Sequence, residues 1–232
     1  MIIRNNDNQQ KEFTKFLKLL NDNELLGTVV VVGSWCEYIY AQSGILKGFS
    51  ASLRTLDADF LIKNLRIPNT PTNLTSLARE AGYIVMSDSL NRTTKILTEN
   101  GLEIEFLITQ LGRGDKPVLK TNLGVNAQSL RHMDIILKNT ITIDYYGMNT
   151  CVPSPEAYVI HKMIINKERT VAKQKKDSES IYHLIPYLDL VVFKDIYDKL
   201  FKKEQKAVDD FCQQHSENIE LIGKIEHEAD IK

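Results

Sequence analysis

The sequence lacks a long apolar run and an excess of charge of either sign. No uninterrupted stretch approaches the roughly 18 apolar residues of a membrane-spanning helix, and the N-terminus turns polar after its first residues. The 29 basic and 30 acidic residues leave a formal net charge of -1, so no bulk field indicates nucleic acid or an anionic membrane as a partner. We therefore expect a soluble, cytoplasmic protein in which any basic binding site is local.

The sequence also has few cysteines and no pattern of metal-ligating residues. Cys36, Cys151 and Cys212 are odd in number and far apart, which favours reduced thiols over a disulfide framework. The five histidines share no ligand spacing with the cysteines or with each other, so a zinc site is not expected. Internal repeats and low-complexity segments are absent as well.

What is present in the first two-thirds of the chain is a mixture of helical and strand patterns. The continuous β-branched run at 28–32, which contains four valines, is typical of a strand buried on both faces, and Asn100-Gly101 is a strong hairpin signal. These patterns predict an α/β (α+β) fold with a mixed sheet flanked by helices. The expected helices lie at 9–21, from Ser34 as the N-cap to about Leu46, and within 69–83, where a capped helix ends at Gly82. The expected strands lie at 28–32 and 56–62, in a hairpin of 93–99 with 102–108, and at 133–137 and 140–145.

The pattern changes after Val152, where helical spacing dominates. Ser154 is a predicted N-cap and Pro155 a predicted first helical residue, and helices are expected at about 155–168, 170–186 and 193–215. We place a boundary near residue 150, which gives a first domain at 1–150 and a helical C-terminal domain at 151–232.

Two aspartates interrupt the apolar strand predicted at 56–62. On a strand, Asp57 and Asp59 project from the same face. Paired carboxylates repel each other and are costly to desolvate, so such a pair usually needs a cation or a shared proton. A hard ion such as Mg²⁺, which takes oxygen ligands and keeps positions for water and phosphate, suits them.

Glutamates on the predicted hairpin supply a third acid. Glu103 and Glu105 share a face of the strand at 102–108, which the hairpin could bring beside residues 56–62. Three carboxylates on neighbouring strands would form a site for one or two metal ions. The spacing alone does not choose between the two glutamates, and we favour Glu105 because it directly precedes the apolar "FLI".

Gly33 and Ser34 provide a candidate phosphate site at the end of the valine strand. A glycine lets the backbone approach a ligand closely, and the helix that follows presents free N–H groups and a positive dipole end to phosphate. Further along, Lys162, Arg169, Lys173 and Lys176 would form one basic stripe if a single helix persisted. That stripe could contact nucleotide phosphates or an acceptor.

Each of these features has a plainer interpretation. A Gly-Ser after a strand is often only a turn with a helix cap, and an Asp-x-Asp pair can decorate a solvated edge. The glutamates can form the wet face of a hairpin, and a lysine stripe is usually a solvated helix face. Asp177 could orient Lys162 or Lys176 by a salt bridge or cap a turn. The order of all the features along the chain is what favours a common site.

That order, "VVGSW…RTLDADFLI…LEIEFLI", resembles the DNA polymerase β-like nucleotidyltransferase superfamily. The likeness is closest to the bacterial toxin-type nucleotidyltransferases of type IV toxin–antitoxin systems, since Arg54 and Thr55 precede the two acids and Lys162 lies on a later helix. Trp35 departs from the pattern, because small or polar residues are usual there. The resemblance covers roughly residues 25–185.

The resemblance implies transfer of a nucleoside monophosphate from a nucleoside triphosphate to a hydroxyl, with Mg²⁺ or Mn²⁺. It implies a catalytic domain at 1–150, an acceptor that could be RNA such as a tRNA end, a protein or a small molecule, and a possible antitoxin partner. A binding or regulatory module that retains the fold without turnover is the alternative. By this resemblance Asp57, Asp59 and Glu105 would bind metal, and Gly33, Ser34, Arg54, Thr55 and Lys162 would contact the nucleotide.

Overall fold

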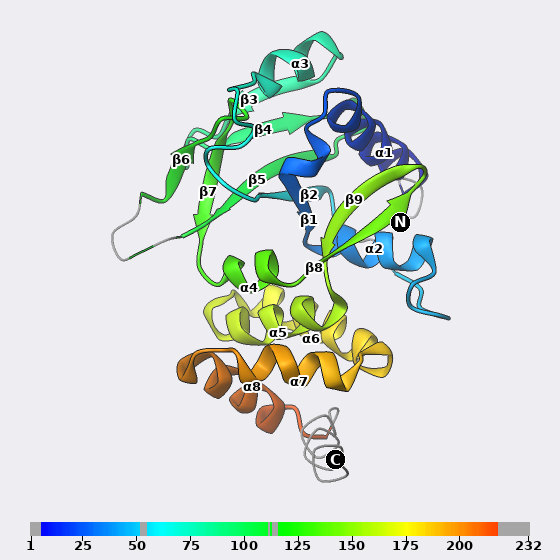
Figure 1. Cartoon of the computed structure of the whole chain (residues 1–232), viewed down its shortest axis with the longest axis vertical. Helices are drawn as coiled ribbons and strands as arrows, with labels where there is room; N and C mark the ends of the chain where they lie inside the picture. The colour runs from blue at the N-terminus through cyan, green and yellow to red at the C-terminus, as the bar shows by residue number, and fades with distance from the viewer. Residues whose placement is uncertain (1–5, 52–54, 111, 113–115, 218–232) are drawn as a thin grey trace. The chain divides into compact units, whose positions relative to one another are not determined.

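The structure is a computed structural model that describes residues 6–51, 55–110, 112 and 116–217 (Figure 1). The chain divides into two compact units, Met1–Val152 and Pro153–Lys232. The first unit contains a mixed β-sheet with flanking helices, and the second is helical. The fold class predicted from the sequence is thus confirmed.

The sheet of the first unit has the strand order β1-β2-β5-β4-β3, with β7 and β6 continuing from the second half of β5. β2 and β5 are parallel, whereas β1 with β2, β4 with β5 and β3 with β4 are antiparallel. The parallel pair places two strands from distant parts of the chain side by side at the centre. The strands are β1 (Val29–Val32), β2 (Asp57–Ile62), β3 (Ile84–Ser87), β4 (Thr94–Leu97), β5 (Glu103–Thr109), β6 (Val118–Lys120) and β7 (Asn126–Leu130).

The central strands form where the sequence predicts them. All four valines of β1 are buried, as expected for a strand covered on both faces. The hairpin of β4 and β5 turns at Asn100-Gly101, where Gly101 has a φ of 78° that glycine adopts without strain.

Helix α1 (Asn6–Asp22) packs on one face of this sheet. Phe13 and Phe16 lie 6.2 and 5.3 Å, ring centroid to ring centroid, from Phe60 of β2. Side chains alternate along a strand, so Phe60 faces away from Asp57 and Asp59. α1 therefore covers the face of the sheet opposite to the two aspartates.

Trp35 belongs to this core. It is fully buried and stacks on Phe13 at 4.1 Å between ring centroids, with the edge of Tyr38 at 5.6 Å. It lies in α2 (Ser34–Ser43), whose last residue is three residues before the predicted end and which Gly44 follows with a φ of 69°. The bulky residue that departs from the family pattern is thus a packing residue.

Residues 133–137 form a helix, so the strand predicted there is wrong. α4 (Met133–Lys138) buries Met133, Ile135 and Ile136, and a short apolar run of this kind suits a buried strand and a buried helix equally well. The ion pair of Lys138 with Asp134, at 2.8 Å between Nζ and Oδ2, has the i,i+4 spacing of a helix. The helix predicted to end at Gly82 is confirmed as α3 (Leu74–Glu80), which Asn73 caps.

A second hairpin follows α4. β8 (Thr140–Tyr145) pairs with β9 (Met148–Pro153) as a separate two-stranded sheet. The strand predicted at 140–145 is confirmed, whereas β9 was not predicted. The hairpin lies against α1, since the hydroxyl groups of Thr14 and Tyr145 are 3.0 Å apart.

The second unit consists of helices that follow the predicted order. Ser154 caps the first of them by accepting a hydrogen bond from the N–H of Ala157, with Pro155 at its start. The single helix predicted at 193–215 is two helices, because the chain turns at 199–201 and Glu204 accepts the N–H of Phe201 to start the last one. The helices are α5 (Pro155–Ile165), α6 (Val171–Leu184), α7 (Leu190–Asp198) and α8 (Lys202–Gln214).

Two further features follow from the described residues. Cys36, Cys151 and Cys212 are buried free thiols, as the absence of a disulfide pattern predicted. None of the helices in the described ranges has the length and apolar character needed to cross a membrane.

Candidate active site

The centre of the sheet aligns four carboxylates on one face. In the parallel pair of β2 and β5, Asp57 lies opposite Glu103 and Asp59 lies opposite Glu105. Paired residues of neighbouring strands share a face, with the strands about 4.8 Å apart. The prediction that the glutamate strand lies beside the aspartate strand is thereby confirmed.

Asp59 reaches the bend that ends β1. Gly33 follows Val32, which pairs with Asp59 across the strands. Gly33 has a φ of 71°, and a Cβ atom there would lie 2.8 Å from Oδ2 of Asp59. Two observations therefore favour glycine at position 33. The backbone has a conformation that other residues rarely adopt, and a Cβ atom there would meet the carboxylate of Asp59.

Gly33 and Ser34 lie at the start of α2, but the cap differs from the prediction. Gly33 is the N-cap and Ser34 is the first residue of the helix, with no cap hydrogen bond from a side chain. The expectation that Ser34 caps the helix is therefore wrong by one residue. The start of the helix and the carboxylate of Asp59 nevertheless meet at the same bend, as a site for a triphosphate with its cation requires.

Lys95 binds both glutamates of the row. It lies opposite Glu105 in the antiparallel pair of β4 and β5. Its Nζ forms an ion pair with Glu103 and another with Glu105, 2.7 Å from Oε1 of the latter, and lies 3.7 Å from Oδ2 of Asp88. The face thus carries four carboxylates in register and one ammonium group.

The two glutamates have different environments. The hydrogen bond from Lys95 lowers the pKa of Glu103. In Glu105 burial raises the pKa, and this effect outweighs the opposite effect of the hydrogen bond from Lys95. Its bonds to both glutamates raise the pKa of Lys95, so the ammonium stays protonated at neutral pH. The lysine therefore acts here as a fixed positive charge.

The donors of this face suit a hard divalent cation. Asp57 is exposed and Asp59 is partly buried, and adjacent carboxylate oxygens on one face are the ligands that Mg²⁺ and Mn²⁺ prefer. Across the described part of the chain, no three acidic, histidine or cysteine side chains are already arranged around a metal position. Both glutamates of the row are instead ion-paired with Lys95.

Of the remaining predicted nucleotide contacts, Thr55 and Lys162 belong to different units. Thr55 lies two residues before the start of β2, where its Oγ1 accepts a hydrogen bond of 3.3 Å from the N–H of Asp57. Arg54 lies outside the described residues. Lys162 belongs to α5 in the second unit.

Lys162 forms an ion cluster within that second unit. Its Nζ is 2.6 Å from Oδ1 of Asp177, and Nε of Arg169 is 3.0 Å from Oδ2 of the same aspartate. The ammonium also lies 4.9 Å from the centre of the Tyr158 ring. Asp177 is therefore the salt-bridge partner of Lys162, one of the interpretations left open by the sequence.

The condition for a continuous basic stripe, a single helix from Lys162 to Lys176, is not met. α5 ends at Ile165, a 3-10 turn spans Asn166–Glu168, and α6 begins at Val171. The chain reverses between the two helices, so Lys162 and Arg169 converge on Asp177 instead of lining one surface.

Lys95 is the residue that sequence reasoning missed. Its signal was the hairpin itself, since strands joined at Asn100-Gly101 place Lys95 near the glutamates of the partner strand. Cross-strand pairs of opposite charge are common in antiparallel sheets.

Comparison with solved structures identifies similar folds. An antigenic nucleotidyltransferase-like protein from Paracoccidioides brasiliensis matches with a TM-score of 0.53 and 16% identity, over 92% of this chain and 91% of that chain. ANT(2'')-Ia in complex with adenylyl-2''-tobramycin matches with a TM-score of 0.48 and 12% identity, over 90% and 99% of the respective chains. At these identities the fungal protein supports the fold alone. No curated protein matches the chain.

A family model described as nucleotidyltransferase matches residues 11–203. The match contains the valine strand, the Gly33 bend, the carboxylate row and the Lys162 cluster, and it extends over most of the chain. The protein therefore belongs to this nucleotidyltransferase family.

Proposed function

We propose that the protein transfers a nucleoside monophosphate from a nucleoside triphosphate to a hydroxyl group of an acceptor. The acceptor oxygen forms a bond to the α-phosphorus, the bond from that phosphorus to its bridging oxygen breaks, and pyrophosphate leaves with the electron pair. The hydroxyl proton is lost to solvent. The observation that carries the proposal is the packing of the Asp59 carboxylate against the Gly33 bend, with Asp57 on the same face and Glu105 in register.

Each residue of the face has a role in this proposal. Asp57 and Asp59 would hold Mg²⁺ or Mn²⁺, and Glu105 would be the third carboxylate. A bound divalent ion neutralises phosphate charge and aligns the reacting oxygens. The backbone at Gly33 and Ser34 would bind the triphosphate at the start of α2.

Contacts to the rest of the nucleotide are proposed for three further residues. Thr55 lies beside Asp57, to whose N–H its hydroxyl oxygen is bonded. Arg54 precedes it in the sequence, and Lys162 is held by Asp177 within the second unit. We assign the transfer chemistry to the domain at 1–150 and a supporting role to the helical domain at 151–232.

The finer assignment is the toxin-type branch. The run from Arg54 to Asp59 and the later pair of Lys162 and Asp177 support it. In that branch the acceptor would be RNA, a protein or a small molecule in the cytoplasm, and an antitoxin protein would be the partner. Purification of the chain from its native host, followed by identification of co-purifying proteins, tests the partner.

Transfer of label tests the activity itself. The protein is incubated with cell extract and each α-labelled nucleoside triphosphate, and label is sought in RNA, protein and small molecules. We expect transfer by the wild type and a loss of at least about 100-fold in Asp57→Ala and Asp59→Asn, since each removes a charge on which the reaction depends. Glu99→Gln, an exposed carboxylate in the hairpin turn, is the matched control. Unchanged transfer in both aspartate variants would refute the assignment.

The ion pairs of Lys95 favour one alternative, a nucleotide-binding module without turnover. A lysine that keeps the third carboxylate occupied would leave a pocket that binds but does not react. Calorimetry with each triphosphate, with and without Mg²⁺, separates the two functions. Metal-dependent binding with no transfer product in any extract would support the module.

A further inference from the structure

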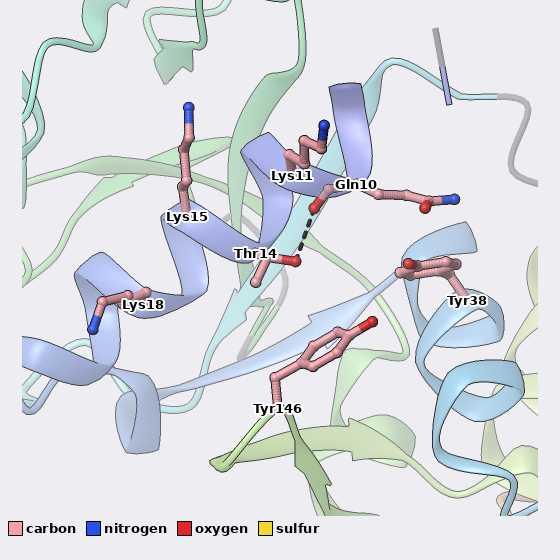
Figure 2. A pocket seen from close by; sticks show the side chains of 7 residues that line it. All are labelled: Gln10, Lys11, Thr14, Lys15, Lys18, Tyr38 and Tyr146. Carbon is pink, nitrogen blue, oxygen red and sulfur yellow. Dashed lines mark hydrogen bonds between the residues drawn. The ribbon is translucent and has the colours of Figure 1, made fainter. Parts of the chain in front are cut away.

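A groove on the first unit lies on the side of the sheet opposite to the carboxylate row. It has a volume of about 510 Å³ and is lined by residues of α1, α2 and the turn between β8 and β9. Because α1 packs on the Phe60 face of β2, this groove is separate from the candidate active site. Figure 2 shows its lining residues, which are Gln10, Lys11, Thr14, Lys15, Lys18, Tyr38 and Tyr146.

The charge of the groove has one sign. Its lining contains three lysines and, among the described residues, no acidic side chain. Lys11, Lys15 and Lys18 have the i, i+4, i+7 spacing that aligns side chains along one side of a helix. Lys18 forms an exposed ion pair with Asp22 at 3.1 Å, and such pairs are weak, so Lys18 can exchange this partner for a ligand's anionic group. Lys15 is itself exposed but pairs at 2.9 Å with Glu12, whose side chain is buried.

The aromatic part of the groove is held in an unusual conformation. Tyr146 and Gly147 form the two-residue turn of the hairpin with φ values of 52° and 78°, a geometry that favours asparagine followed by glycine. A tyrosine at a positive φ is strained, yet its side chain remains 70% exposed. Its edge-on contact with Tyr145, at 4.7 Å between ring centroids, offsets only part of the strain energy of the positive φ. Strain of this kind points to a role for the exposed ring.

The exposed ring of Tyr146 and the lysines line the same groove. Tyr38, which is buried, lies in its wall on the side of Tyr146, while the lysines follow along α1 with the ammonium groups of Lys11 and Lys15 directed away from the rings (Figure 2). Thr14 is fixed there, since its hydroxyl donates to the carbonyl of Gln10 at 2.8 Å. An exposed flat ring beside a row of cations is the combination that binds single-stranded nucleic acid, with bases on the ring and phosphates on the lysines.

We propose that this groove binds single-stranded RNA. Charge complementarity favours a polyanion, and the exposed ring of Tyr146 favours one that carries bases over an acidic peptide. The inference does not rest on the transfer reaction, because the groove and the carboxylate row occupy opposite faces of the sheet.

The test is the binding of a fluorescently labelled adenosine oligoribonucleotide of about ten nucleotides, within the usual site size of such grooves. We expect the full-length protein to bind it with an affinity that falls as salt rises. An abasic strand of the same length should bind about tenfold more weakly, the change expected from the loss of one stacked base.

Two variants separate stacking from charge. Tyr146→Asn should bind the adenosine strand about tenfold more weakly and should no longer distinguish it from the abasic strand. Its stability should not fall, since asparagine tolerates the positive φ of this turn. Lys11→Gln combined with Lys18→Gln should weaken both strands alike and flatten the salt dependence, whereas Lys120→Gln on β6 is the control and should change neither.

The active-site variant Asp59→Asn should retain RNA binding, which distinguishes a failure here from a failure of the proposed reaction. The proposal is overturned if Tyr146→Asn binds both strands as the wild type does. It is also overturned if a poly-glutamate peptide competes as well as RNA of equal charge, because the groove would then recognise acidic chains in general.

Discussion

Oε1 of Glu105 lies 2.7 Å from Nζ of Lys95, directly across the hairpin of β4 and β5. The same ammonium binds Glu103 and lies near Asp88. A lysine thus occupies one end of a carboxylate row whose other end, at Asp57 and Asp59, suits a divalent cation. A cation that used Glu105 as a ligand would have to compete with Lys95 for it.

The first prediction concerns removal of this lysine. Lys95→Met leaves two partly buried glutamates without their cation, and we expect the free energy of unfolding to fall by about 1–3 kcal/mol in metal-free buffer. Mg²⁺ should restore part of that loss and should raise the melting temperature of the variant more than that of the wild type.

Trp35 provides the measurement. It is the only tryptophan of the chain and is buried on Phe13, so its fluorescence reports unfolding of the first unit. Mn²⁺ binding, followed by electron paramagnetic resonance, should be tighter in the variant. Equal metal-induced shifts in both proteins would show that Lys95 and the cation do not compete.

The second prediction concerns the ion cluster of the second unit. The side chain of Asp177 is 4% exposed and that of Lys162 is 12% exposed. Asp177→Ala leaves Lys162 and Arg169 without their shared anion, and we expect a loss of about 3–5 kcal/mol, as for other buried pairs from which one partner is removed.

Chemical denaturation followed by circular dichroism gives this loss, and the double variant Lys162→Met with Asp177→Ala should recover part of it. Lys162→Met alone should also weaken nucleotide binding. For each variant, the loss of nucleotide binding is compared with the loss of unfolding free energy. If Lys162→Met and Asp177→Ala lost binding only in proportion to the stability that they lost, the role of Lys162 would be structural and it would not contact the nucleotide.

Much of this fold follows from local patterns that the sequence displays openly. The valine run of β1 and the Asn100-Gly101 turn each specify one structure, and Ser154-Pro155 marks a helix start. The strand β3 could not be predicted in this way, because its side chains are mostly exposed and its apolar residues do not alternate. The prediction for 133–137 was wrong for a different reason. A short run of buried apolar residues is compatible with a strand and with a helix.

The candidate site was predictable in part. The spacing of Asp57 and Asp59 requires a common face on any strand, whereas the parallel register that sets Glu105 opposite Asp59 depends on how distant segments pair. The close approach of Asp59 to Gly33 and the ion pairs of Lys95 with the glutamates are tertiary contacts, so the sequence pattern alone could not predict them. The break between the two helices that carry Lys162 and Asp177 was predicted from the sequence, whereas the convergence of Lys162 and Arg169 on Asp177 is again a tertiary contact.

The third prediction is a pH dependence in the second unit. Burial lowers the pKa of His215 from 6.5, and its Nδ1 is 2.6 Å from the hydroxyl of Tyr182. Because the folded state resists protonation, the unfolded state binds more protons once the pH falls below about 6.5. The histidine therefore lowers stability as the pH falls from neutral through that value toward its folded pKa.

Urea titrations between pH 7.5 and 5.5 measure how the free energy of unfolding depends on pH. His215→Gln should flatten the pH dependence of the unfolding free energy in that interval, while His183→Gln, an exposed histidine of α6, should leave it unchanged. The effect should be small, since the ring is only partly buried. An identical slope in wild type and His215→Gln would assign the pH dependence to other groups.

The fourth prediction compares two glycines at the two ends of α2 that both have a positive φ. Gly33 has a φ of 71° and a ψ of -159°, whereas Gly44 has a φ of 69° and a ψ of 13°. A Cβ at Gly33 would lie 2.8 Å from Oδ2 of Asp59, whereas none of the described atoms lies within 4 Å of a Cβ at Gly44. Gly44→Ala carries the cost of the left-handed region, about 1–2 kcal/mol. The conformation of Gly33 is almost exclusive to glycine, so Gly33→Ala carries a backbone cost of about 1–3 kcal/mol and, in addition, the displacement of a carboxylate.

We therefore expect Gly33→Ala to be the less stable of the two variants by Trp35 fluorescence. It should also lose Mn²⁺ binding and nucleotide transfer, whereas Gly44→Ala keeps both. Both substitutions add one methyl group at an end of the same helix, so loss of metal binding and transfer in Gly33→Ala alone would point to the bend at which the carboxylate of Asp59 lies. If Gly33→Ala retained metal binding and transfer at the level of Gly44→Ala, the close approach of Asp59 to the bend would have no part in the site.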